Sequence, residues 1–82
     1  MTRRIEWTAR AAKDLDACHR ELRQRILSAV EKMAEGEGDV RRLRDVIPPL
    51  FRLRVGDYRL LFRYEAGTVV VLRVLPRDKA YR

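Results

Sequence analysis

The chain has 82 residues, of which 46% are hydrophobic and 38% charged, and its net charge is +7. This length predicts one small domain, residues 1–82, with a thin core, and the mixing of charged with apolar residues excludes a disordered tail. The longest uninterrupted apolar run, Val69–Leu72, is too short for a membrane span or a signal-peptide core, so we expect a cytoplasmic protein with no membrane partner.

The first half of the chain predicts one strand followed by two helices. Residues Arg3–Trp7 alternate between polar and apolar side chains, as in a short strand. Thr8 is well placed to cap the helix that follows. Apolar residues then recur at helical spacing, and the polar stretch Ala17–Glu21 is the expected break between two helices that form a hairpin. Gly36 and Gly38 are expected to end the second helix.

The second half predicts strands. Val40–Val46 is a weak strand, whereas Phe51–Val55 and Tyr58–Tyr64 are strong strands joined by a two-residue Gly-Asp turn. Val69–Leu75 is the last strand. The order β-α-α-β-β-β predicts an α+β fold, in which a two-helix hairpin packs on one face of a small antiparallel sheet.

A tight turn at Gly56-Asp57 fixes the register of the strong hairpin, because it pairs Val55 with Tyr58 and Arg54 with Arg59. Side chains alternate between the two faces of a strand, so this register also assigns the faces. The face expected to lie under the helices consists of Phe51, Leu53, Val55, Tyr58, Leu60, Phe62 and Tyr64. The opposite face, called the arginine face below, consists of Arg52, Arg54, Arg59 and Arg63, with Leu61 among them.

The last strand is expected to extend the arginine face. Arg73 suits the polar side better than the core, and this choice places Arg77 there as well. Val71 would then join Leu61 as an apolar floor between the arginines. Tyr81 could stack on a nucleic-acid base or, equally, tether the C-terminal segment to the sheet.

The whole excess of positive charge lies in the second half. Residues 40–82 hold eleven basic side chains, ten of them arginine, against four acidic ones, whereas residues 1–39 are balanced. Arg54 opposite Arg59 is a like-charge pair, which is unfavourable unless an anion binds there. Guanidinium groups suit phosphate, so we expect a nucleic-acid partner; the alternative is a sheet surface that only faces water.

Other catalytic motifs are absent from the sequence. One histidine and one cysteine do not make a metal cluster, so neither a metal nor another cofactor is expected. We expect Cys18 to be a packed thiol in a reducing compartment and His19 to be a surface residue. Fixed guanidinium groups could stabilise the charge that gathers on phosphorus when a 2′-hydroxyl attacks its neighbouring phosphate. Arginine stays protonated, however, and is a poor general base.

The segment Leu50–Phe62 resembles the signature hairpin of toxins of the RelE/ParE superfamily. Trp7-Thr8 before an alanine-rich helix, Leu43, and the ending with Arg77 and Tyr81 are similar to that family too, so the resemblance spans nearly the whole chain. It implies the same β-α-α-β-β-β fold and a place in a type II toxin–antitoxin pair. The implied partner is a cognate antitoxin with an acidic or amphipathic segment.

The resemblance also implies roles for single residues in the RelE branch, whose toxins cut messenger RNA in the ribosomal A site without a metal. Arg52 and Arg54 match paired basic residues, and Arg59 matches the arginine that binds the scissile phosphate. Arg77 matches an acid or charge stabiliser, and Tyr81 matches a tyrosine that stacks on the substrate base. The further residues expected to contact RNA are Arg63, Arg73 and Leu61.

Three functions stay open on the sequence. ParE-branch toxins, which poison DNA gyrase, generally lack the pair formed by Arg77 and Tyr81, so this pair favours a ribosome-dependent endoribonuclease. A gyrase inhibitor is the first alternative. A noncatalytic RNA-binding module or decayed toxin is the second.

Overall fold

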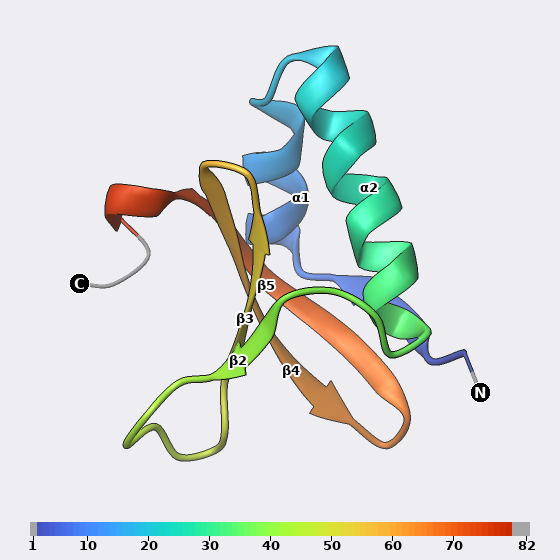
Figure 1. Ribbon diagram of the computed structural model, residues 1–82, viewed down its shortest axis with the longest axis vertical. Coiled ribbons are helices and arrows are strands. Elements are labelled where there is room, and N and C mark those ends of the chain that lie inside the picture. Colours follow the sequence, from blue (N-terminus) through green and yellow to red (C-terminus); the bar gives the residue numbers. More distant parts are fainter. Residues whose placement is uncertain (1, 80–82) are drawn as a thin grey trace.

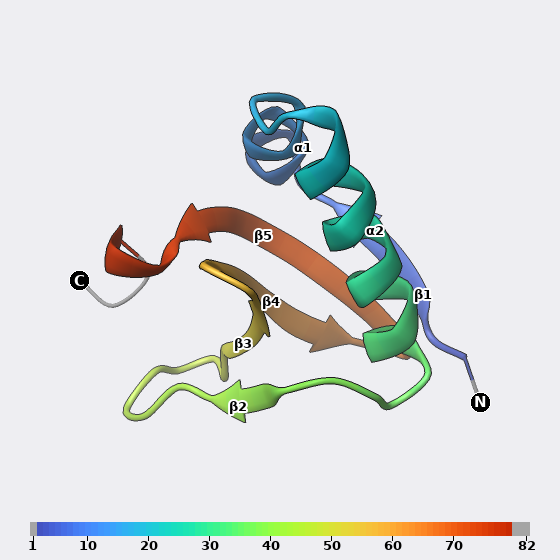
Figure 2. The same cartoon turned by 45° about the horizontal axis from the view of Figure 1, so that its top comes forward.

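The computed structural model describes residues 2–79, which form two helices packed on a five-stranded sheet (Figure 1). The elements, in chain order, are β1 (Arg4–Trp7), α1 (Ala9–Asp16), α2 (Arg20–Ala34), β2 (Val40–Arg42), β3 (Phe51–Val55), β4 (Tyr58–Glu65), β5 (Thr68–Pro76) and the 3₁₀ turn η1 (Arg77–Lys79). Both helices lie on the same side of the strongly twisted sheet (Figure 2). The predicted α+β fold is confirmed, and the order of elements is β-α-α-β-β-β with one strand more, because the weak strand of the sequence is present as β2.

Side-chain caps define where both helices begin. The Thr8 hydroxyl accepts a hydrogen bond from the backbone N–H of Ala11 at 3.1 Å, which confirms the predicted cap of α1. The Nδ1 atom of His19 accepts from the N–H of Leu22 at 3.3 Å and caps α2 in the same way. The break between the helices falls at 17–19, inside the predicted stretch, and Gly36 (φ +94°) follows the end of α2.

The sheet is mixed, and in this respect it differs from the predicted antiparallel sheet. Its strand order is β1-β5-β4-β3-β2, and every neighbouring pair is antiparallel except β1 with β5, which runs parallel from Arg4 opposite Thr68 to Trp7 opposite Val71. The chain leaves β1 directly into α1, while the N–H of Thr8 still donates to the Val71 carbonyl at 3.0 Å. Helix α1 packs against the second half of β5. The chain enters α1 directly from β1, so the end of β1 has to lie next to this half of β5, and β1 therefore runs parallel to β5.

The core lies between the helices and the sheet. Its buried side chains come from one face of β3, β4 and β5 and from one stripe of each helix, as the alternation in β3 and β4 predicts. They are Ala11, Leu15, Ile26, Val30, Met33, Leu53, Val55, Leu60, Phe62, Val69, Val71 and Val74.

Val71 belongs to this core, so the prediction that it joins Leu61 on the arginine face is wrong. The register between β4 and β5 shifts after Leu61: Leu61 pairs with Arg73, but Phe62 pairs with Val71, which leaves Leu72 as an extra residue in β5. An extra residue reverses the alternation of side chains along a strand. Val71 therefore faces the core on one side of the bulge, and Val74 faces it on the other.

Candidate functional site: the arginine face

The hairpin of β3 and β4 has the predicted register. Val55 pairs with Tyr58, and Arg54 pairs directly with Arg59. The turn between them has Gly56 at φ +56°, the left-handed conformation that a Gly-X turn requires at its first position. Since the neighbours of these arginines in each strand are buried under the helices, Arg52, Arg54 and Arg59 share the opposite face, as predicted.

Arg59 is the most buried arginine of this face, with 6% of its surface exposed. Its Nη1 atom donates to the carbonyl oxygens of Gly56, at 2.8 Å, and Tyr58, at 2.9 Å. Its Nε is fully buried, and no group within residues 2–79 accepts a hydrogen bond from it. A buried donor without an acceptor costs about 1–3 kcal/mol. The guanidinium is thus held by backbone dipoles at the turn, and no carboxylate of residues 2–79 forms an ion pair with it.

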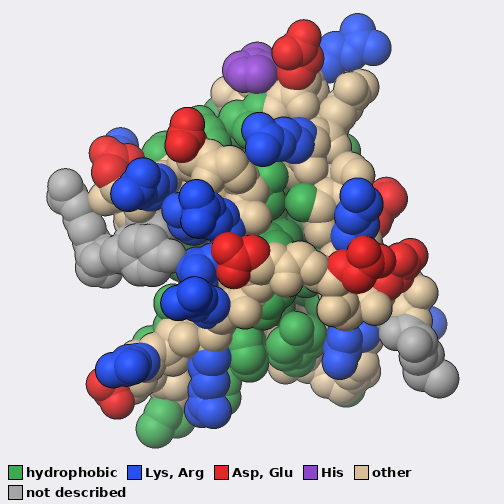
Figure 3. Space-filling model, viewed as in Figure 1, with side chains coloured by type: hydrophobic (Ala, Val, Ile, Leu, Met, Phe, Trp, Pro, Cys, Tyr) green, Lys and Arg blue, Asp and Glu red, His purple; other side chains and the backbone are tan. Residues whose placement is uncertain are grey.

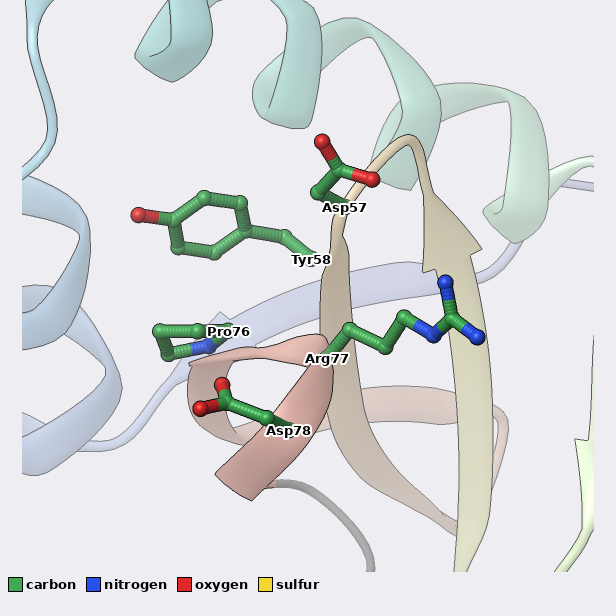
Figure 4. A pocket seen from close by; sticks show the side chains of 5 residues that line it. All are labelled: Asp57, Tyr58, Pro76, Arg77 and Asp78. Carbon is green, nitrogen blue, oxygen red and sulfur yellow. The ribbon is translucent and has the colours of Figure 1, made fainter.

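The same turn anchors Arg77. The backbone N–H of Arg77 donates to the Asp57 carbonyl at 2.8 Å, so three successive carbonyls of the turn accept hydrogen bonds from Arg59 or Arg77. The Arg77 side chain is exposed and points toward the β3–β4 hairpin, away from the Asp57 and Asp78 carboxylates (Figure 4). It has no ion-pair partner among the described residues.

A hollow of about 760 Å³ lies beside the turn and is lined by Asp57, Tyr58, Pro76, Arg77 and Asp78. Its two carboxylates disfavour an anion inside it. Figure 4 shows the Arg77 guanidinium directed out of this hollow, toward the hairpin. The site for an anion is therefore the surface beside the hairpin, where exposed Arg54 lies across from Arg59, and not the hollow itself.

Three other arginines of the predicted face are engaged by carboxylates of the chain. Arg63 lies 3.1 Å from the Glu65 carboxylate. Arg52, whose side chain is 10% exposed, donates to the Asp39 carbonyl at 3.3 Å and lies 3.7 Å from its half-exposed carboxylate. The third, Arg73, lies next to Leu61 in the sheet, but its guanidinium is bound by a carboxylate of α1. Of the arginines predicted for this site, Arg54, Arg59 and Arg77 have no carboxylate partner within residues 2–79, and exposed Arg41, the cross-strand neighbour of Arg52, has none either.

Asp14 of α1 holds Arg73 and is a residue that the sequence analysis missed. One carboxylate oxygen accepts from the Arg73 Nε at 2.8 Å and from the Val74 N–H at 3.0 Å. Burial raises the pKa of Asp14, but these two hydrogen bonds and the charges of Arg73 and Arg10 outweigh it and lower the pKa below its usual value. Conversely, the hydrogen bond from Arg73 to Asp14 raises the pKa of Arg73.

The spacing of apolar residues along α1 could have identified Asp14 from the sequence. It lies three residues after Ala11 and four before Cys18, so it falls on the buried stripe of α1. A carboxylate in such a stripe needs a partner. Cys18 packs beside it, with Sγ 3.5 Å from the Asp14 carbonyl, and burial together with the negative charge of Asp14 raises the pKa of the thiol. This agrees with the packed thiol predicted for Cys18.

Leu61 is partly buried on the arginine face between Arg52 and Arg73, its cross-strand neighbours. Tyr81 lies outside the described residues. Within residues 2–79 there is no group of three or more His, Cys, Asp or Glu side chains that could hold a metal ion, and no helix is long and apolar enough to cross a membrane.

Comparisons with known proteins identify a family and several similar folds. The family described as "ParE toxin of type II toxin-antitoxin system, parDE" matches residues 5–81. The toxin–antitoxin complex RelBE2 of Mycobacterium tuberculosis contains a similar chain, 33% identical, with a TM-score of 0.69 over 94% of this chain and 100% of that one. No curated protein sequence matches.

Two further solved structures share the fold. A chain of the archaeal RelE–RelB complex from Pyrococcus horikoshii is 24% identical and superposes with a TM-score of 0.76 over 98% of this chain and all of that one. A chain of the chromosomal ParDE system of Pseudomonas aeruginosa is 21% identical, with a TM-score of 0.67 over 92% of this chain and 96% of that one. Structures named for both branches of the superfamily are therefore similar to this chain.

Proposed function

Because this chain belongs to the ParE toxin family of type II toxin–antitoxin systems, within the RelE/ParE superfamily, we propose that it is a toxin that cleaves ribosome-bound messenger RNA with its arginine face. The observation that supports this most directly is Arg59, a buried guanidinium at a fixed position with no carboxylate partner among the described residues. Arg54 and Arg77 add two exposed guanidinium groups near the same turn.

This arrangement suits the charge that develops during RNA cleavage. When a 2′-hydroxyl attacks the adjacent phosphate, negative charge accumulates on the non-bridging oxygens of pentacoordinate phosphorus. Donors that are fixed before the reaction stabilise this charge without reorganising. In the proposal, Arg59 and Arg54 bind the scissile phosphate, and Arg77 stabilises the charge that forms on it.

The other predicted residues take supporting roles in the proposal. Arg52 is held by Asp39 and supports the phosphate site through its charge. Tyr81 would stack on a base of the RNA. Arg63, Arg73 and Leu61 would contact RNA beside the site, although ion pairs with Glu65 and Asp14 reduce the charge that the two arginines offer. The proposed partners are messenger RNA on the ribosome and a cognate antitoxin.

Induction of the chain alone tests the proposal. We expect growth arrest together with messenger RNA cut inside codons, and we expect Arg59→Leu to lower the cleavage rate by about 10²–10³-fold, the usual effect of removing one transition-state donor. Arg20→Leu, which removes an exposed arginine from the start of α2, is the matched control. Intact transcripts during the arrest would contradict the proposal.

Inhibition of DNA gyrase is the second candidate, and the match to the ParE family favours it. The arginine face would then bind a protein or DNA surface and would not need to catalyse a reaction. In that case the purified chain inhibits supercoiling by gyrase, and its induction triggers a DNA-damage response while transcripts stay intact. A noncatalytic module would produce neither effect and would bind RNA in a salt-sensitive way.

A further inference from the structure

The helices leave one end of the core side of the sheet uncovered. Helix α2 ends at Ala34, whose carbonyl accepts from the N–H of Arg3 at 3.0 Å. Phe62 is completely buried, but Tyr64, two residues further along the same face, is 39% exposed, and Phe51 is half-buried. Hydrophobic surface is visible there in Figure 3, over the lower part of the sheet.

A pocket of about 440 Å³ opens at this end and is called the end pocket here. Its lining is mostly apolar and comes from the proline pair before β3 and from the facing ends of β3 and β4. The lining residues are Pro48, Pro49, Phe51, Arg63, Tyr64 and Glu65. Next to it, Ile47 has 93% of its surface exposed. Contiguous apolar surface of this kind marks an interaction site in small proteins.

The rim of the end pocket is cationic. Arg42 is the cross-strand neighbour of Phe51 and shares its face of the sheet. The guanidinium carbon of Arg3 lies 4.8 Å from the centroid of the Tyr64 ring. Both arginines are exposed, and neither has a carboxylate within 4.0 Å among the described residues, whereas Arg63 is engaged by Glu65.

We propose that the end pocket is a docking site for the antitoxin: it takes an aliphatic side chain of an acidic, amphipathic segment, whose flanking carboxylates bind Arg42 and Arg3. This inference rests on the proposed function, since it takes the antitoxin as the partner. A peptide fits better than RNA, because the proline walls offer aliphatic surface and Arg3 already covers the Tyr64 ring. A segment with apolar and acidic residues matches both the pocket and its rim.

The position of the end pocket separates neutralisation from toxicity. Arg54 and Arg59 lie on the opposite face of the sheet, near the other end of the β3–β4 hairpin. Changes at Ile47 and Pro49, which spare Arg63, therefore leave the proposed RNA site intact. They should yield a toxin that still arrests growth but that its antitoxin no longer neutralises.

The test uses the full chain and the purified product of the reading frame next to its gene, with binding measured by calorimetry. Pro49→Glu places a carboxylate in the exposed wall of the pocket, and we expect it to weaken binding by about tenfold or more. Ile47→Glu, at a side chain 93% exposed, repeats the test without removing a buried contact. The matched control is Leu27→Glu, which changes an apolar side chain on α2 that is 39% exposed.

Growth assays complete the test. With either pocket variant, induction should arrest growth as the unchanged chain does, and co-expression of the neighbouring protein should no longer relieve the arrest. Binding of both pocket variants within about twofold of the unchanged chain would overturn the inference. So would an equal loss of affinity for single-stranded RNA, because the pocket would then belong to the RNA site. If the unchanged chain binds the neighbouring protein but never arrests growth, the proposed function fails while the docking site stands.

Discussion

At the scale of single residues, the state of each arginine depends on whether the chain supplies a carboxylate for it. Arg73, Arg63 and Arg52 have one within 4.0 Å, whereas Arg59 is bound by two backbone carbonyls. A carbonyl orients a guanidinium without cancelling its charge. Arg59 therefore keeps a full charge at a fixed position directly across from the exposed Arg54, and the proposed phosphate site depends on this charge.

Asp14 allows a prediction about stability and pH. Its pKa is lowered in the folded chain, so it stabilises the fold above its unfolded value of about 4, and this contribution is lost as pH falls through the folded pKa. We expect Asp14→Ala to lower the free energy of unfolding by about 1–3 kcal/mol at pH 7. Asp14→Asn should cost less, because its amide oxygen can still accept from the N–H of Val74.

Urea unfolding at pH 7 and pH 3 would measure both variants of Asp14. The difference in stability between the unchanged chain and Asp14→Asn should shrink at the lower pH, because Asp14 binds a proton more readily in the unfolded chain, where its pKa is not lowered. An equal difference at both values would show that the charge of Asp14 contributes nothing. Asp16, an exposed carboxylate at the end of the same helix, supplies the control Asp16→Asn.

At the scale of elements, two turns of the β3–β5 meander use positive φ angles in different ways. Gly56 has φ +56°, and the Arg25 guanidinium lies only 3.1 Å from where a Cβ atom would be. Gly67 has φ +80° with open space around it, and its neighbour Ala66 is itself at φ +45°. A Cβ atom at the first turn would thus also displace the exposed Arg25 side chain slightly, whereas the second turn is constrained by backbone conformation alone.

Replacing each glycine separately with alanine distinguishes the effect of the Arg25 contact from the effect of backbone conformation. Gly67→Ala should cost about 1–2 kcal/mol of stability from backbone strain. Gly56→Ala should cost at least as much, since Arg25 has to move as well. It should also lower RNA cleavage, because the Gly56 carbonyl orients Arg59. Thermal unfolding and the cleavage assay measure the two effects, and full activity of Gly56→Ala would argue against a role for this carbonyl.

Ala66 offers a change in the opposite direction. A non-glycine residue with positive φ is strained, and asparagine tolerates this conformation better than alanine. We expect Ala66→Asn to raise the free energy of unfolding by about 0.5–1 kcal/mol. Chemical denaturation would show it as a higher midpoint with an unchanged slope, and a lower midpoint would contradict the assignment of strain to Ala66.

At the scale of the whole molecule, charge is distributed unevenly over the two faces of the sheet. The arginine face offers Arg54, Arg59 and Arg77 without carboxylate partners among residues 2–79, while the helices cover most of the other face. At the end pocket the core side is open, and there the surface is mostly apolar with a cationic rim. One small domain thus presents two different surfaces, which suit RNA and an antitoxin.

The salt dependence of RNA binding tests this distribution. Each phosphate contact on a single strand contributes about −0.7 to the slope of log K against log salt concentration, so the guanidinium groups of Arg54, Arg59 and Arg77 should together contribute about −2 to this slope. Arg54→Gln should reduce its magnitude by about 0.7, whereas Arg63→Gln, whose arginine is paired with Glu65, should change it less. Fluorescence anisotropy with a short RNA measures both slopes, and equal effects would contradict the assignment of free charge.

The sequence by itself determined the β3–β4 hairpin and its faces, because a two-residue turn and the period of two leave one register. The helix break and the Thr8 cap were also determined locally. Only the tertiary structure decided the bulge at Leu72, which places Val71 in the core, the parallel pairing of β1, and the capture of Arg73 by Asp14, 59 residues away in sequence. These features depend on contacts between segments that are distant in the sequence, and a short-range sequence pattern does not determine such contacts.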